Sequence, residues 1–167
     1  MELLGRLLIQ RGEWDALIAM HTGELAAIAD PREQADQHLR IGELHERNRG
    51  DDGAAAEAYG RAVALDPTLE EASRALGRTL VRLERWTEYV TVLEAEASRA
   101  GRAEARLDAL CRAAEVQATR LGDLEAAVDT WRRALELEPR DLRAIRGLAR
   151  LCHHTDRFRE LLELNGR

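Results

Sequence analysis

The chain has 167 residues, of which 45% are apolar and 34% charged, and its 25 basic and 31 acidic side chains give a formal net charge of −6. This composition, with only three prolines, excludes a disordered or collagen-like chain. The acidic balance argues against nucleic acid as a partner, and no apolar run approaches the roughly 20 residues that span a membrane.

Helices are expected along the whole chain, because apolar residues recur at steps of three and four and no segment alternates with period two. In chain order, the signals are an apolar stripe over 14–25, a helix start at Asp30-Pro31-Arg32-Glu33, a capping-box spacing at 68–71, and apolar stripes over 86–97, 124–135 and 158–162. We therefore expect about ten helices.

An internal repeat of 72 residues organises these helices. Trp14, Trp86 and Phe158 are each 72 residues apart, and the same offset relates Gly50 to Gly122 and Pro67 to Pro139. A unit of this length is too long for one supersecondary element, so it divides into two helical hairpins.

The segment 121–139 contains Ala127, Trp131 and Ala134 ahead of Pro139, and it resembles the second half of a tetratricopeptide (TPR) repeat. Segment 50–67 has the same pattern. The resemblance implies an all-α, right-handed α-solenoid of TPR-like helix-turn-helix repeats that forms one domain over 1–167. Counting in steps of about 34 residues from the two prolines places repeats near 36–69, 70–107, 108–141 and 142–167, with a partial repeat over 1–35.

The ends of the array lack an evident polar capping helix, which a solenoid uses to hide its apolar faces. Two explanations stay open. The chain is a segment of a longer array, or its open ends self-associate.

The sequence offers few groups for catalysis, and we expect no enzyme activity, metal or cofactor. The chain has no lysine and no glycine-rich phosphate loop, and His45-Glu46 lacks the second histidine of a zinc motif because position 49 is Arg. The densest set of candidate ligands is Cys152, His153, His154 and Asp156. Adjacent helical side chains point about 100° apart, so a polar helix end is the favoured interpretation, and a metal-dependent domain is the least favoured alternative.

Most of the remaining unusual side chains are assigned to the core or its rim. The six aromatic residues all fall on second helices, which leaves none for stacking on nucleic-acid bases. His21 and His38 lie within or beside apolar stripes, and Cys111 and Cys152 occupy positions that the TPR family buries. Two such cysteines form no disulfide framework, and the start of the chain carries no export signal, so we expect a cytoplasmic location.

Arginine is the only basic residue type besides histidine, and it recurs in register with the repeats. The fifth and ninth positions, counted from the four repeat starts, include Arg40, Arg74, Arg78, Arg112, Arg146 and Arg150. In TPR proteins these first-helix positions line a concave groove, so the resemblance implies a groove lined with guanidinium groups. Arginine binds carboxylates through its planar fork. The expected function is therefore a protein interaction scaffold that binds an acidic peptide or helix, with no membrane partner.

A structural interpretation of the same arginines stays open. An acidic residue precedes three of them by four residues, an arrangement worth about 0.2–0.5 kcal/mol per pair in a helix, in Asp36–Arg40, Glu70–Arg74 and Asp108–Arg112. Arg146 breaks this pattern because Leu142 stands at the acidic position. The alternative function is a structural segment that assembles through its open ends.

Overall fold

The computed structural model describes residues 2–154, and side chains from 3 to 151. Within this range the chain forms nine α-helices and no β-strand, so the all-α prediction is confirmed. The stripe over 158–162, which would add a tenth helix, lies outside the described residues. The chain divides into two compact units, Met1–Arg85 and Trp86–Arg167, here called unit 1 and unit 2. The prediction of a single domain stays a prediction.

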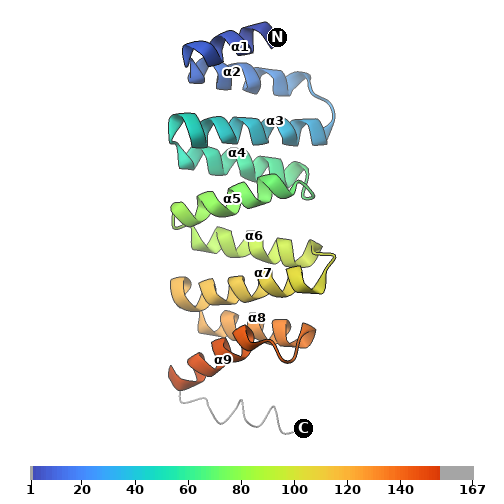
Figure 1. The fold of residues 1–167 in the computed structure, drawn as a ribbon, viewed down its shortest axis with the longest axis vertical. Helices are drawn as coiled ribbons and strands as arrows, with labels where there is room; N and C mark the ends of the chain where they lie inside the picture. Colours follow the sequence, from blue (N-terminus) through green and yellow to red (C-terminus); the bar gives the residue numbers. More distant parts are fainter. Residues whose placement is uncertain (1, 155–167) are drawn as a thin grey trace. The chain divides into compact units, whose positions relative to one another are not determined.

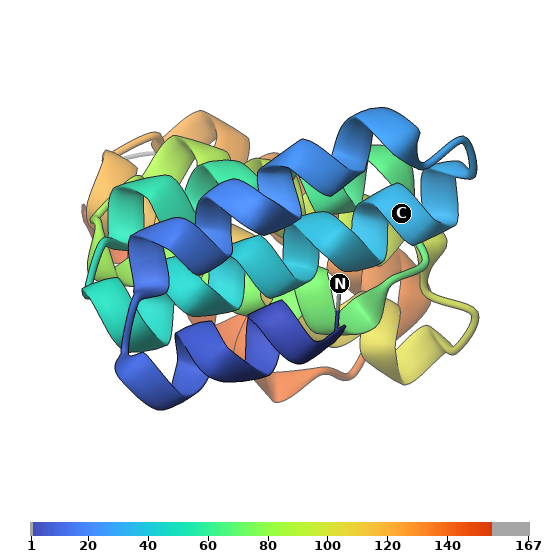
Figure 2. The ribbon, with the colours of Figure 1, turned by 90° about the horizontal axis from the view of Figure 1, so that it is seen from above.

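Unit 1 is built from antiparallel helices that pack against their neighbours in sequence (Figure 1). Its elements are α1 (Glu2–Arg11), α2 (Trp14–Glu24), the 3-10 turn η1 (Leu25–Ala27), α3 (Pro31–Leu44), the π-helical turn η2 (His45–Arg49), α4 (Asp52–Leu65) and α5 (Glu70–Arg82). Figure 2 shows the same helices from above.

Unit 2 repeats this order. Its elements are α6 (Trp86–Arg99), α7 (Ala103–Val116), the π-helical turn η3 (Gln117–Leu121), α8 (Leu124–Leu137) and α9 (Leu142–His154). Each begins 72 residues after its counterpart among α2, α3, η2, α4 and α5. The repeat read from the sequence is therefore a structural repeat.

Aspartate side chains cap the N-termini of α3, α4 and α8. Asp30 accepts a hydrogen bond from the Arg32 N–H at 3.0 Å, with Pro31 as the first helical residue, which confirms the predicted start. Asp51 and Asp123 cap α4 and α8 in the same way, at 2.9 and 3.0 Å. Each cap satisfies an N–H that has no acceptor inside its own helix.

The prediction of a capping box at 68–71 was wrong. Thr68 instead donates both its N–H and its hydroxyl to the Asp66 carboxylate, at 2.9 and 2.6 Å. This local turn occupies the threonine side chain, and α5 starts after Leu69 with no side-chain cap.

The first helices of two hairpins begin before the repeat starts that the sequence predicts near residues 36 and 108. They begin at Pro31 and Ala103, run for 14 residues each, and continue into five-residue π-helical turns. Gly50 and Gly122 end these turns with φ of 64° and 68°, where glycine is favoured. The 13-residue α5 continues into no such turn, so the hairpins of one unit differ in length.

Each unit has an aromatic ring packed against a glycine. In unit 1 the fully buried Tyr59 of α4 covers Gly42 of α3. In unit 2 the counterpart Trp131 of α8 covers Gly147 of α9 and joins a core of alanines and leucines. A larger residue at either glycine would push the helices apart.

Candidate interaction surface

The six predicted arginines divide equally between the units. Unit 1 has Arg40 on α3 with Arg74 and Arg78 on α5, and unit 2 has their counterparts, 72 residues later, on α7 and α9. All six side chains are exposed. The two sets can therefore be compared position by position.

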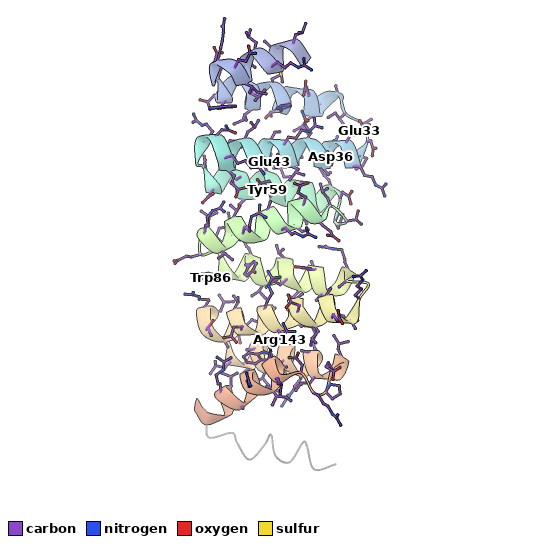
Figure 3. The ribbon with its side chains drawn as sticks, in the orientation of Figure 1. Glu33, Asp36, Glu43, Tyr59, Trp86 and Arg143 are labelled. Atoms are coloured by element: carbon purple, nitrogen blue, oxygen red, sulfur yellow. The ribbon has the colours of Figure 1, made fainter. Side chains whose placement is uncertain are left out.

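In unit 1, only Arg74 has a partner. It forms the predicted ion pair with Glu70, one turn earlier on α5, and both side chains are more than two-thirds exposed. Arg40 and Arg78 form no hydrogen bond or ion pair with any side chain that the structure describes, so the expected Asp36–Arg40 pair is absent there. Figure 3 shows Asp36 with Glu33 and Glu43 along α3, above Tyr59 of α4.

In unit 2, two arginines of α9 bridge to acidic residues of α7. Arg150 lies 3.2 Å from the Glu115 carboxylate, and Arg143 donates to Asp108 at 2.7 Å. Arg146 lies between them in sequence and has no partner among the described side chains. The bridges thus hold α9 to α7 and leave Arg146 without a counter-charge.

Arg112 differs from the other five because its guanidinium contacts the preceding helix. It donates to the Tyr89 hydroxyl at 2.6 Å and lies 4.0 Å from the Glu96 carboxylate, both on α6. The predicted pair with Asp108 also forms, at 3.7 Å. Partial burial opposes the charge, but the Tyr89 bond and the nearby acids raise the Arg112 pKa. Arg112 therefore ties α7 to α6 while it keeps its charge.

A second polar cluster, in unit 1, is one that the sequence did not reveal. Tyr59 donates to Glu46 at 2.7 Å, while Arg82 donates to Glu46 at 2.6 Å and to both Asp52 oxygens, at 2.9 and 2.7 Å. Burial opposes ionisation of Glu46, yet the bonds from Tyr59 and Arg82 lower its pKa. The unit 2 counterparts of Glu46, Asp52 and Tyr59 are Ala118, Leu124 and Trp131. No short motif marks this cluster, because Arg82 lies 30 and 36 residues from its acidic partners.

His21 and Cys111 both have structural surroundings. His21 contacts Glu24 and Gln37 through Nδ1, at 3.1 and 2.9 Å, at the rim between α2 and α3. Cys111 is buried, and burial together with the charge of Asp141 raises its pKa to about 11.

The candidate metal ligands predicted from the sequence lie at the C-terminal end of the chain. Asp156 and the side chains of Cys152, His153 and His154 lie outside the described residues. Over the remainder of the chain, no group of three or more His, Cys, Asp or Glu side chains is arranged to hold a metal ion. None of the described helices is long and apolar enough to cross a membrane.

Comparison with known proteins agrees with the fold. A family model described as "Tetratricopeptide repeat" matches residues 1–35, the hairpin of α1 and α2. A crystal structure of MamA superposes with a TM-score of 0.51 at 21% identity, covering 90% of this chain and 83% of that one. The structure titled "MamA RS-1 ArsTM double mutant" gives 0.52 at 17% identity, covering 97% and 86%. Residues 1–35 thus match the tetratricopeptide repeat family, and the chain as a whole shares the fold of the MamA structures.

This likeness of fold confirms the predicted all-α solenoid class. The matched segment 1–35 is the one that the sequence placed as a partial repeat. No curated protein sequence matches the chain. The TPR fold alone does not identify a partner, because one fold serves many functions.

Proposed function

We propose that this TPR-like protein is an interaction scaffold that binds an acidic peptide or helix of another protein along its first helices. The observation that carries the proposal is the state of Arg40, Arg78 and Arg146, which are exposed and form no hydrogen bond or ion pair with a described side chain, although the charge of Arg78 helps to lower the pKa of Glu46. Arg74, Arg112 and Arg150 complete the basic surface, although each also contacts an acidic side chain.

The placement of like charges supports this proposal. Arg74 and Arg78 lie one turn apart on α5, as do Arg146 and Arg150 on α9. Like charges at this spacing destabilise a helix by a few tenths of a kcal/mol, roughly as much as an opposite pair stabilises it. A bound carboxylate relieves that repulsion and accepts charge-assisted hydrogen bonds from the guanidinium groups. Binding should weaken with salt, since exposed charges are screened over about 8–10 Å at physiological ionic strength.

A second candidate function, self-assembly through an open end, is favoured by α1. Leu3, Leu4 and Leu7 of this helix are 83%, 48% and 42% exposed. Their counterparts in α5 are Ala75, Leu76 and Thr79, which are buried on a helix that packs against α4. We infer from this exposed apolar face that α1 packs against a second copy of the chain. Sedimentation velocity over a concentration series tests this, and a wild-type sample that sediments as a monomer throughout would rule it out.

The test of the acidic-partner proposal compares the wild type with Arg78→Glu/Arg150→Glu. Both proteins are immobilised, shown to be folded by circular dichroism, and used to capture partners from native-source lysate at low and moderate salt. Poly-glutamate is added as a competitor in a parallel capture. We expect the double variant, the higher salt and the competitor each to release the same partner. Capture that none of the three alters would remove the arginines as a binding surface.

The proposal assigns the protein no catalytic step and no cofactor. It also places the protein in the cytoplasm, supported by a buried cysteine that forms no disulfide.

A further inference from the structure

The two units differ in charge at equivalent positions of their last described helices. The exposed side of α5 in unit 1 carries Glu70 and Glu71 beside Arg74 and Arg78. In α9 of unit 2 the counterparts of the two acids are Leu142 and Arg143. Helix α9 therefore has three arginines and no acidic residue along its 13 positions.

This exchange removes the acidic residue that could pair with Arg146 inside its own helix. Arg74 is paired with Glu70 inside its own helix, whereas Arg146 has the 61% exposed Leu142 in the place of that acid. Arg143 and Arg150 stand three residues before and four residues after Arg146, so all three share one side of α9. We call these three residues the α9 arginine face.

Helix α7 orients this face. Asp108 holds Arg143 at 2.7 Å and Glu115 holds Arg150 at 3.2 Å (Arg143 is labelled in Figure 3). These ion pairs hold two of the three guanidinium groups and leave the third without a carboxylate among the described side chains. Within that part of the chain an incoming acidic group meets no competitor at Arg146, while at Arg143 and Arg150 it competes with a carboxylate already in place.

We propose that the α9 arginine face of unit 2, centred on Arg146, is the main anchor for the acidic partner, ahead of α5 of unit 1, where Arg74 is paired with Glu70 and Arg78 alone forms no ion pair with a described side chain. This inference rests on the proposed function and assigns it to one of two equivalent surfaces. The occupant is a protein segment in which an acidic side chain stands next to an apolar one, because the exposed Leu142 lies one turn from Arg146. The acidic side chain binds the Arg146 fork, and the apolar side chain packs on Leu142.

The chain supplies its own matched control for a binding experiment. The probe is a fluorescein-labelled peptide of alternating Glu and Leu, followed by fluorescence anisotropy with the full chain. A second peptide carries Gln in place of every Glu. The variants are Arg146→Glu in unit 2 and Arg74→Glu at the equivalent position of unit 1, with Arg146→Gln as a milder change. Circular dichroism and the urea midpoint check that each variant is folded.

We expect Arg146→Glu to weaken binding of the Glu peptide by about tenfold or more, because it removes a charge-assisted contact and adds a repulsive charge. Arg146→Gln should weaken it less, and Arg74→Glu should also weaken it less than Arg146→Glu does, because Arg74 already has an acidic partner. The wild type should bind the Gln peptide weakly.

Failure of this inference and failure of the proposed function give different results. If Arg74→Glu weakens binding as much as Arg146→Glu, or more, the assignment to unit 2 is wrong while an acidic partner remains supported. The same holds if Arg146→Glu leaves binding unchanged but the Glu peptide still binds better than the Gln peptide. If the wild type binds both peptides equally, the acidic-partner proposal and the inference both fall.

Discussion

Gly42→Ala tests the closest helix contact in unit 1. A Cβ at position 42 would lie 3.0 Å from Cζ of Tyr59 and nearer still to two other ring carbons. The ring is fully buried, and its hydroxyl donates to Glu46, which Arg82 also holds. The ring cannot withdraw without breaking that bond, so α3 and α4 have to separate.

The expected loss of stability combines one stabilising effect and two destabilising ones. Alanine favours a helix over glycine by about 0.8–1 kcal/mol. Overpacking costs about 1–3 kcal/mol, and loosening a hydrogen bond to a charged acceptor costs about 1.5–3 kcal/mol more. We therefore expect Gly42→Ala to destabilise the protein by about 2–5 kcal/mol. The control is Gly60→Ala, next to Tyr59 on α4, where an added Cβ meets nothing within 4 Å. That change should stabilise by about 0.5–1 kcal/mol.

Urea denaturation followed by far-UV circular dichroism measures both variants. Because repeat proteins can unfold in stages, hydrogen exchange of the α3 and α4 amides should show that the loss lies in unit 1. The double variant Gly42→Ala/Tyr59→Leu should lose less than the sum of its single changes, since it removes the ring that causes the clash. The reasoning is refuted if Gly42→Ala is as stable as the wild type while Gly60→Ala gains.

Three further predictions concern charge and reactivity. Arg82→Gln should lower stability by about 1–2 kcal/mol in urea titrations, because Glu46 and Asp52 lose their shared cation; an unchanged midpoint would contradict this. Hydrogen bonds from Arg82 lower the pKa of Asp52 and, against burial, of Glu46, so the native state binds fewer protons and stability should fall below about pH 4.5. In Arg82→Gln the loss of stability at low pH should be smaller, and a loss equal to that of the wild type would show that Arg82 does not lower these two pKa values. Cys111 in a Cys152→Ser background should react with iodoacetamide about 100-fold more slowly in the folded protein than in urea, because burial raises its pKa to about 11. Equal rates would show an open site.

The two units use one repeat with different chemistry at equivalent positions. Unit 1 joins α4 to α5 through Arg82, which pairs with Asp52 and also with Glu46, whereas unit 2 has Leu124 and Ala118 at the positions of these two acids. On the arginine surface, Glu70 pairs with Arg74 inside α5, whereas α9 has no acidic residue along its length.

The amino-acid sequence by itself determined the helical class, the 72-residue repeat and the start of α3 at Asp30-Pro31. These features depend on residues within a turn or two of each other, or on a spacing that recurs along the chain. Local competition also explains the failed capping box at Thr68, whose hydroxyl is held by Asp66.

Only the tertiary structure decided which arginines have partners. The bonds of Arg143 to Asp108, Arg150 to Glu115 and Arg82 to Glu46 join residues about one repeat apart, where a change in helix length alters which side chains meet. Arg146 and Arg74 hold the same position in the repeat, and a single exchange of Glu70 for Leu142 gives them different surroundings. The sequence could place the arginines on a helix, but their free or paired state depends on which acidic side chains the packed helices bring within reach.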